Sequence, residues 1–179
     1  ALSGSSVLVV GANGAFGAEF CNQLLEAGAT VFGTARSPET SARLRADLAQ
    51  RLLLDLESQD SISTLATYLN SIPEPLDGIV LASGLVAFGP ISETPPEVRR
   101  KLFEVNALGQ INLVSQLISK LKASSDSGKA PFVVSISGVI AENPMAGLAA
   151  YSASKTALLG YANAASKELK KLGIRWLDA

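Results

Sequence analysis

The stretch Ser6-Val-Leu-Val-Val-Gly-Ala-Asn-Gly-Ala-Phe-Gly17 joins a strand-length apolar run, residues 6–10, to a turn with glycines at positions 11, 14 and 17. Glycine allows a tight turn and a close approach of the backbone to a pyrophosphate, and the free N–H groups at the start of a following helix attract the anion. A tight turn alone would not need three glycines at this spacing. The stretch therefore predicts a dinucleotide-binding turn between a buried strand and a helix.

Apolar runs of strand length alternate with longer helical patterns along the whole chain. We expect strands at residues 6–10, 30–34, 51–56, 78–82, 132–136 and 174–177. We expect helices at residues 15–27, 41–50 and 62–70, a helix from an N-cap at Thr94 to about Lys122, and a helix at residues 149–172. Such alternation is the signature of βαβ units. It predicts an α/β fold, a Rossmann-type doubly wound parallel sheet with residues 78–82 near its centre.

The length of the chain fits one domain, and we predict a single dinucleotide-binding domain over residues 1–179. Nothing polar or helical covers the edge of the sixth expected strand. We therefore expect the C-terminal part of the fold, after that strand, to be missing from these residues.

Composition narrows the classes of function. The net charge of −1 provides no electrostatic footprint for nucleic acid or an anionic membrane, and no apolar run reaches the ~18 residues of a membrane span. Histidine is absent, which excludes a Ser-His-Asp triad and any histidine-based metal site. Cys21 is the only cysteine and is interpreted as an inert core thiol. We expect a cytoplasmic protein with no metal, no nucleic-acid partner and no membrane partner.

Tyr151 and Lys155 are four residues apart in the last expected helix. Residues at i and i+4 share one helix face, so the amine can lie beside the phenol. A neighbouring ammonium favours the phenolate, and the tyrosine can then exchange protons near neutral pH. A surface Tyr and Lys on an ordinary helix is the competing interpretation, but the glycine turn at the other end of the chain favours the catalytic one.

Arg36 follows the second expected strand, where dinucleotide-binding folds meet the adenosine ribose. An acidic residue there would bind the ribose 2′-hydroxyl, whereas an arginine suits a 2′-phosphate. Ala35 occupies the place where the acid would stand. The pattern favours NADP(H) over NAD(H), against the alternative of an exposed loop arginine.

Over nearly its whole length the chain resembles the short-chain dehydrogenases/reductases, in their non-extended branch. Gly11, Gly14 and Gly17 match the family's glycine turn, and Tyr151 and Lys155 match its catalytic pair. The resemblance implies that Tyr151 is the general acid/base and that Lys155 binds the nicotinamide ribose and lowers the tyrosine pKa. It also implies a dimer or tetramer, because members commonly pair through two of their helices.

Further residues take roles from the same resemblance. Asp55 matches the aspartate that touches the adenine, and Asn106 matches the active-site asparagine that holds a water in a proton relay. The family's Asn-Asn-Ala-Gly stretch is here Leu81-Ala82-Ser83-Gly84, in which Gly84 still allows the cofactor to approach. The complete set of expected cofactor-binding residues is Gly11, Asn13, Gly14, Phe16, Gly17, Arg36, Asp55, Leu56, Gly84, Tyr151 and Lys155.

One departure concerns catalysis. The family's catalytic serine lies thirteen residues before the tyrosine, and that position is Gly138, with Ser137 beside it. If the hydroxyl acts like one oxyanion donor, its loss costs about 2.7–4 kcal/mol in the transition state. Three explanations stay open: Ser137 serves after a one-residue shift, a group such as Asn143 replaces the hydroxyl, or efficient chemistry has been lost. With Ser137 included, the candidate catalytic residues are Tyr151, Lys155, Asn106 and Ser137.

Two connections, residues 85–91 and 139–150, are unusually apolar and follow strand ends, where open α/β sheets bind ligands. We interpret them as an apolar substrate wall; the alternative is that they pack on each other. Asp77, Glu93 and Glu142 are interpreted as solvated turn acids, and Trp176 as a core residue.

The leading hypothesis is an NADP(H)-dependent oxidoreductase that interconverts a small-molecule carbonyl and an alcohol. The alternative is a cofactor-binding protein with weak or no turnover and a redox-responsive or signalling role, which Gly138 favours.

Overall fold

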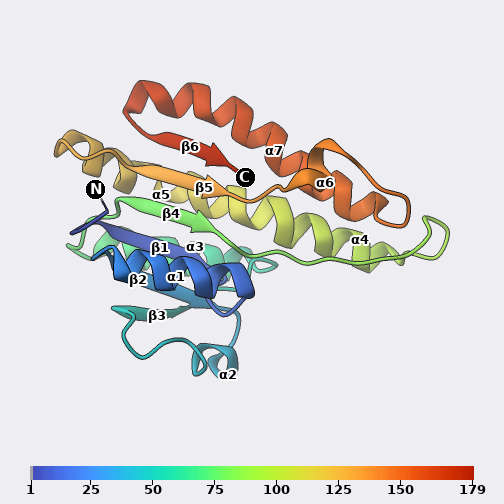
Figure 1. The fold of residues 1–179 in the computed structure, drawn as a ribbon, viewed down its shortest axis with the longest axis horizontal. Coiled ribbons are helices and arrows are strands. Elements are labelled where there is room, and N and C mark those ends of the chain that lie inside the picture. The colour runs from blue at the N-terminus through green and yellow to red at the C-terminus, as the bar shows by residue number, and fades with distance from the viewer. Residues whose placement is uncertain (1) are drawn as a thin grey trace.

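The computed structural model of the protein describes residues 2–179. Its strands form one parallel sheet in the order β3-β2-β1-β4-β5-β6 (Figure 1). They are β1 Ser6–Val10, β2 Thr30–Ala35, β3 Gln50–Leu53, β4 Gly78–Leu81, β5 Phe132–Ser135 and β6 Arg175–Asp178. The expected doubly wound sheet is confirmed, with β1 and β4 as its two central strands. The strand order reverses between β1 and β4, and ligands bind open α/β sheets at such a switch point.

Long helices connect the strands. They are α1 Ala15–Glu26, α3 Gln59–Ser71, α4 Pro96–Phe103, α5 Gly109–Asp126 and α7 Ala149–Leu169. Two four-residue helices, α2 Pro38–Ser41 and α6 Val139–Glu142, the π-helical segment η1 Glu104–Leu108 and the 3₁₀ turn η2 Lys170–Leu172 complete the set. The strand arrowheads in Figure 1 point to the side of the molecule where α6 and the start of α7 lie.

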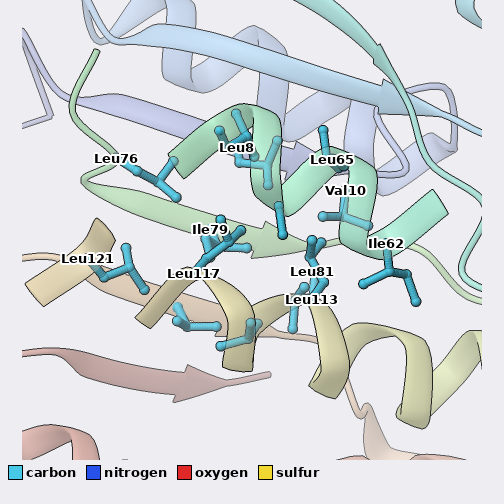
Figure 2. Close-up of a cluster of buried hydrophobic side chains, with 14 of the residues drawn as sticks. Leu8, Val10, Ile62, Leu65, Leu76, Ile79, Leu81, Leu113, Leu117 and Leu121 are labelled. Atoms are coloured by element: carbon cyan, nitrogen blue, oxygen red, sulfur yellow. The ribbon is translucent and has the colours of Figure 1, made fainter. Parts of the chain in front are cut away.

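Two apolar clusters hold the layers together, one on each face of the sheet. Successive residues of a strand point to opposite faces, so Leu8 and Val10 pack with α3 and α5 while Val7 and Val9 pack with α1. Figure 2 shows the first cluster, in which Leu113 and Leu117 of α5 lie against the strands. All five residues of β1 are buried, which explains the unbroken apolar run at residues 7–10.

The prediction of a helix at residues 41–50 is wrong. Ser37 caps α2, and Pro38 occupies its first turn, so the helix begins earlier and ends at Ser41. The chain then turns so that Leu44 and Leu48 both join the core cluster on the α1 face. A Cβ at Gly33 would lie 2.7 Å from a methyl carbon of Leu48. Tertiary packing beside Gly33 therefore overrides the local helical pattern.

The helix expected from Thr94 to Lys122 also differs. Its N-cap is Pro95 rather than Thr94, whose hydroxyl donates to the carbonyl oxygen of Pro90 at 3.0 Å. The segment η1 interrupts it, and α5 then continues to Asp126, beyond the expected end. The last helix agrees with expectation, and Gly173 ends it in the left-handed conformation.

Buried and exposed positions mostly agree with the sequence. Trp176 and Cys21 are buried, and burial raises the pKa of the Cys21 thiol to about 11, which keeps it protonated. Glu93 and Glu142 are exposed, as expected. No helix within residues 2–179 is both long and apolar enough to span a membrane.

Asp77 was expected in a solvated turn, and that interpretation is wrong. The side chain is buried and accepts hydrogen bonds from the Ser6 N–H at 2.9 Å, from Ser124 Oγ at 2.6 Å and from Lys129 Nζ at 2.7 Å. Burial favours a higher pKa, but the bonds from Lys129, Ser124 and Ser6 outweigh it and hold the pKa of Asp77 below its ordinary value. Asp77 therefore ties β1 to the end of α5.

Asp77→Asn is expected to lower the free energy of unfolding at pH 7 by about 1.5–3 kcal/mol, because three donors lose an ionised acceptor. The folded-state pKa lies below the unfolded value, so this stabilisation is present above the unfolded pKa and is lost as the pH falls through the folded pKa. Urea denaturation of both proteins from pH 7 to pH 3 checks this. A difference in stability that stays constant down to pH 3 would contradict it.

Candidate active site

A cavity of about 630 Å³ opens at the carboxyl ends of the central strands. Residues from the whole length of the chain meet in it. Every expected cofactor-binding residue except Gly17 lines it, namely Gly11, Asn13, Gly14, Phe16, Arg36, Asp55, Leu56, Gly84, Tyr151 and Lys155. Ser137 also lines it, whereas Asn106 does not. The fold therefore gathers residues that the sequence separates by more than a hundred positions.

The glycine turn is shaped by contacts that exclude side chains. Gly11 has φ +79°, and a Cβ there would lie 2.3 Å from Ser83 Oγ. A Cβ at Gly17 would lie 2.1 Å from the carbonyl oxygen of Gly11, so α1 can approach the turn closely only through glycine. The N-cap Gly14 offers no side-chain cap, and the first turn of α1 carries no acidic residue. These features fit a pyrophosphate at the start of α1.

Tyr151 and Lys155 lie on the first turns of α7 and both face the cavity. Lys155 is buried, and its Nζ donates to the carbonyl oxygen of Ile136, just after β5, at 2.7 Å. Desolvation lowers the pKa of Lys155, and the negative charge of Asp178 opposes that shift. The lysine is thus held in place by the sheet while the cavity remains open beside it.

Asn106 lies in the π-helical segment η1 and is fully buried. Its Oδ1 accepts from the N–H of Leu85 at 2.7 Å, and its Nδ2 donates to the carbonyl oxygen of Leu85 at 2.8 Å and to Ser154 Oγ at 3.0 Å. Both amide hydrogens are used, so a water has only the remaining lone pair of Oδ1 on this side chain. The role of Asn106 as a water ligand stays a prediction, and its visible role is to join the loop after β4 to α7.

Gln110, on α5, is a buried polar residue near the cavity that was not among the expected site residues. It is fully buried, and its Nε2 donates to the carbonyl oxygens of Ser83 and Val105, each at 2.9 Å. Its Oε1 has no partner among the described residues. Gln110 thereby connects the π-helical segment to the loop that packs against Gly11. A signal was present, because a glutamine four residues after Asn106 interrupts the apolar stripe of α5.

The structure bears on two of the three explanations for Gly138. Ser137 is buried, and its hydroxyl donates to the carboxylate of Asp178, which also accepts from Ser135. A serine has one proton to donate, so Ser137 in this arrangement has none for a substrate. Asn143 is exposed and does not line the cavity. Neither residue supplies the missing hydroxyl here, and the Asp178 partnership was not anticipated from the sequence.

Arg36 reaches the cavity at the end of β2. Its Nη2 lies 2.9 Å from Glu57 Oε2, and its Nε lies 3.7 Å from Asp55 Oδ1. Lys101 Nζ lies 3.4 Å from the same Glu57 oxygen. Glu57 and Lys101 were not among the expected site residues, although both line the cavity.

The two apolar connections contact each other but remain largely uncovered. The N–H of Gly89 donates to the carbonyl oxygen of Gly147 at 2.9 Å, which joins them. Their side chains Phe88, Val139 and Met145 are nevertheless exposed, and Val139 also lines the cavity. The backbones of the two connections therefore contact each other, while Phe88, Val139 and Met145 stay exposed and Ile140 and Ala141 are buried.

Comparison with known proteins places this arrangement in a family. The family model for short chain dehydrogenase matches residues 5–177. The chain belongs to the short-chain dehydrogenases. Within residues 2–179 of this short-chain dehydrogenase, no three potential metal-ligating side chains gather at one place.

Individual proteins of this family are similar to the chain in sequence and in structure. A short-chain dehydrogenase/reductase of Aspergillus versicolor, notP′, is 27% identical in an alignment of 168 residues that covers 88% of this chain and 57% of that protein. A solved short-chain dehydrogenase from Streptomyces avermitilis superposes with a TM-score of 0.89 at 30% identity, over 98% of this chain and 65% of that one. The complex of Pseudomonas aeruginosa RhlG with NADP gives a TM-score of 0.88 at 30% identity, over 97% and 70%. The chain spans between 56% and 62% of the first three curated relatives.

Proposed function

We propose that this short-chain dehydrogenase interconverts a carbonyl and an alcohol with NADP(H) as cofactor. One observation carries the proposal: Tyr151 and Lys155 line the same cavity as the glycine turn and Arg36. A dinucleotide extended from Arg36 past the turn would bring its nicotinamide toward Tyr151. A bound nicotinamide supplies or accepts the hydride.

The roles of this chain's own residues follow from their places. Tyr151 gives a proton to the carbonyl oxygen, or takes one from the alcohol. Lys155, fixed by the Ile136 carbonyl, holds the nicotinamide ribose, and Asn106 keeps the loop after β4 against α7. At the other end, Arg36 faces the 2′-phosphate and Asp55 the adenine.

The remaining expectations are proposals of the same kind. Val139, which is exposed and lines the cavity, favours a small-molecule substrate with an apolar part, and Phe88 and Met145 are further exposed apolar side chains of the same two connections. We further propose one dinucleotide-binding domain, a homo-oligomer and a cytoplasmic location.

The second candidate is a cofactor-binding protein with weak turnover. It is favoured by the absence of a hydroxyl at position 138 and by the engagement of Ser137 with Asp178. The two candidates differ in turnover but not in cofactor binding.

The test is the oxidation of NADPH and NADH with a panel of aldehydes and ketones of increasing apolar length, followed at 340 nm, together with calorimetric titration of both dinucleotides. We expect NADPH to bind and to be oxidised, faster with the longer substrates. Tight binding without turnover for any substrate would favour the second candidate. No binding of either dinucleotide would overturn both.

Gly138→Ser is expected not to raise the activity of the protein. Gly138 has φ +72° and ψ 168°, a region that is essentially restricted to glycine, although nothing lies within 4 Å of an added Cβ. The variant should lose about 1–3 kcal/mol of unfolding free energy from backbone strain, without a gain in kcat/KM. Urea denaturation and steady-state kinetics check both parts. A clear rise in kcat/KM would show that the segment relaxes and places the new hydroxyl in the site.

A further inference from the structure

Four charged side chains from separate elements meet at the adenosine end of the cavity. Arg36 follows β2, Asp55 and Glu57 follow β3, and Lys101 lies on α4. All four line the cavity. Two carry positive and two carry negative charge, so this corner is close to neutral as a group.

Glu57 is the central member of the group. Its Oε2 lies 2.9 Å from Arg36 Nη2 and 3.4 Å from Lys101 Nζ, so one carboxylate oxygen is shared by two cations. Asp55 lies farther from Arg36, at 3.7 Å through Nε. The Nη2 side of the Arg36 guanidinium is therefore already paired with a carboxylate.

A 2′-phosphate would use the same side of Arg36. Phosphate and carboxylate groups both pair with the guanidinium charge, so the 2′-phosphate and the Glu57 carboxylate would compete for the Nη2 side of Arg36. Binding NADP(H) then requires Arg36 to exchange Glu57 for the phosphate, and it also brings a dianion near the Glu57 charge. NAD(H) has no phosphate at this position, so its binding neither separates Arg36 from Glu57 nor brings a further negative charge near Glu57.

We propose that Glu57 is a specificity-determining residue that lowers the preference for NADP(H) over NAD(H) by competing with the ribose 2′-phosphate for Arg36. This inference rests on the proposed dinucleotide binding. Lys101 makes the exchange feasible, because Glu57 keeps one cationic partner when Arg36 leaves it. The ratio of NADP(H) affinity to NAD(H) affinity is therefore closer to one than it would be if Arg36 had no acidic partner.

The experiment compares Glu57→Gln with the parent. Gln keeps the size of the side chain and removes its charge. The dissociation constants of NADPH and NADH are measured by calorimetry at fixed salt. We expect NADPH to bind about two- to fivefold more tightly to the variant, as an exposed ion pair implies, and NADH to change by less than twofold. Equal changes for NADPH and NADH, or no change for either, would overturn the proposal.

Two further variants separate competition from other effects. Glu97→Gln removes an exposed acid of α4 outside the cavity and should leave the NADPH-to-NADH ratio unchanged. Arg36→Gln removes the guanidinium for which Glu57 and the phosphate would compete. Adding Glu57→Gln to this variant should therefore raise the affinity for NADPH only slightly. An undiminished gain there would show that Glu57 acts by repulsion alone and would overturn competition for Arg36.

The same titrations distinguish failure of this inference from failure of the proposed function. Binding of both dinucleotides with a ratio insensitive to Glu57 rejects the inference and leaves the proposed function intact. If neither the parent nor any variant binds either dinucleotide, the proposed function fails and the inference fails with it.

Discussion

Tyr151→Phe is expected to lower kcat/KM for carbonyl reduction by about 100- to 10,000-fold. The substitution removes only the hydroxyl, while the ring keeps its place on α7 at the edge of the cavity. The carbonyl oxygen would then develop negative charge with no proton donor beside it. NADPH binding should change little, since Arg36, the glycine turn and Lys155 remain. Steady-state kinetics with the best substrate of the panel and calorimetry with NADPH measure the two effects separately.

Tyr161→Phe is the matched control. Tyr161 lies on the same helix, does not line the cavity, and packs edge-on against Trp176 with ring centroids 5.8 Å apart. Its variant should keep the parent's kcat/KM. If Tyr151→Phe also kept the parent's rate, the proposed proton transfer would be wrong whatever the cofactor binding showed.

Gly17→Ala is expected to destabilise the protein and to abolish dinucleotide binding. The added Cβ would lie 2.1 Å from the carbonyl oxygen and 2.7 Å from the carbonyl carbon of Gly11. Both atoms belong to the backbone of the turn, so relief requires α1 to move away from β1. We expect a loss of about 3 kcal/mol in unfolding free energy, the upper end for overpacking. Urea denaturation and NADPH titration check the two consequences.

Gly160→Ala on α7 is the control for the same chemical change. Gly160 is an exposed helical residue, and nothing lies within 4 Å of an added Cβ. Because alanine has the higher helix propensity, this variant should gain about 0.5–1 kcal/mol. A Gly17→Ala protein as stable as the parent would mean that the turn is not the close contact seen here.

Much of the fold could be predicted because it depends on local patterns. The strands, the turn at Gly11 and the end of the last helix at Gly173 follow from apolar period and from backbone preferences of single residues. The predictions that were wrong have a common cause, because they concern residues whose structure depends on long-range contacts. Leu44 and Leu48 leave a helical pattern to pack beside Gly33, and Asp77 is buried because Ser124 and Lys129, far along the chain, supply its hydrogen bonds.

The candidate site divides in the same way. The spacing of Tyr151 and Lys155 sets their shared helix face, whatever surrounds them. Whether Ser137 could donate a proton depended on its partner, and that partner, Asp178, lies on another strand. The backbone conformation of Gly138 could not be predicted from the sequence either, because glycine can adopt several conformations and its presence does not specify which one.

The sequence by itself determined the family, the parallel sheet and many of the residues that line the cavity, because glycine spacing, helix periodicity and strand ends are properties of neighbouring residues. Only the tertiary structure decided how those residues are partnered: Arg36 with Glu57, Ser137 with Asp178, and Gln110 with the carbonyls of Ser83 and Val105. Hydrogen bonds and ion pairs act over a few ångströms. Elements distant in the chain reach that range only when the sheet and its helices pack, so the donors and acceptors of the site could not be assigned before the fold was known.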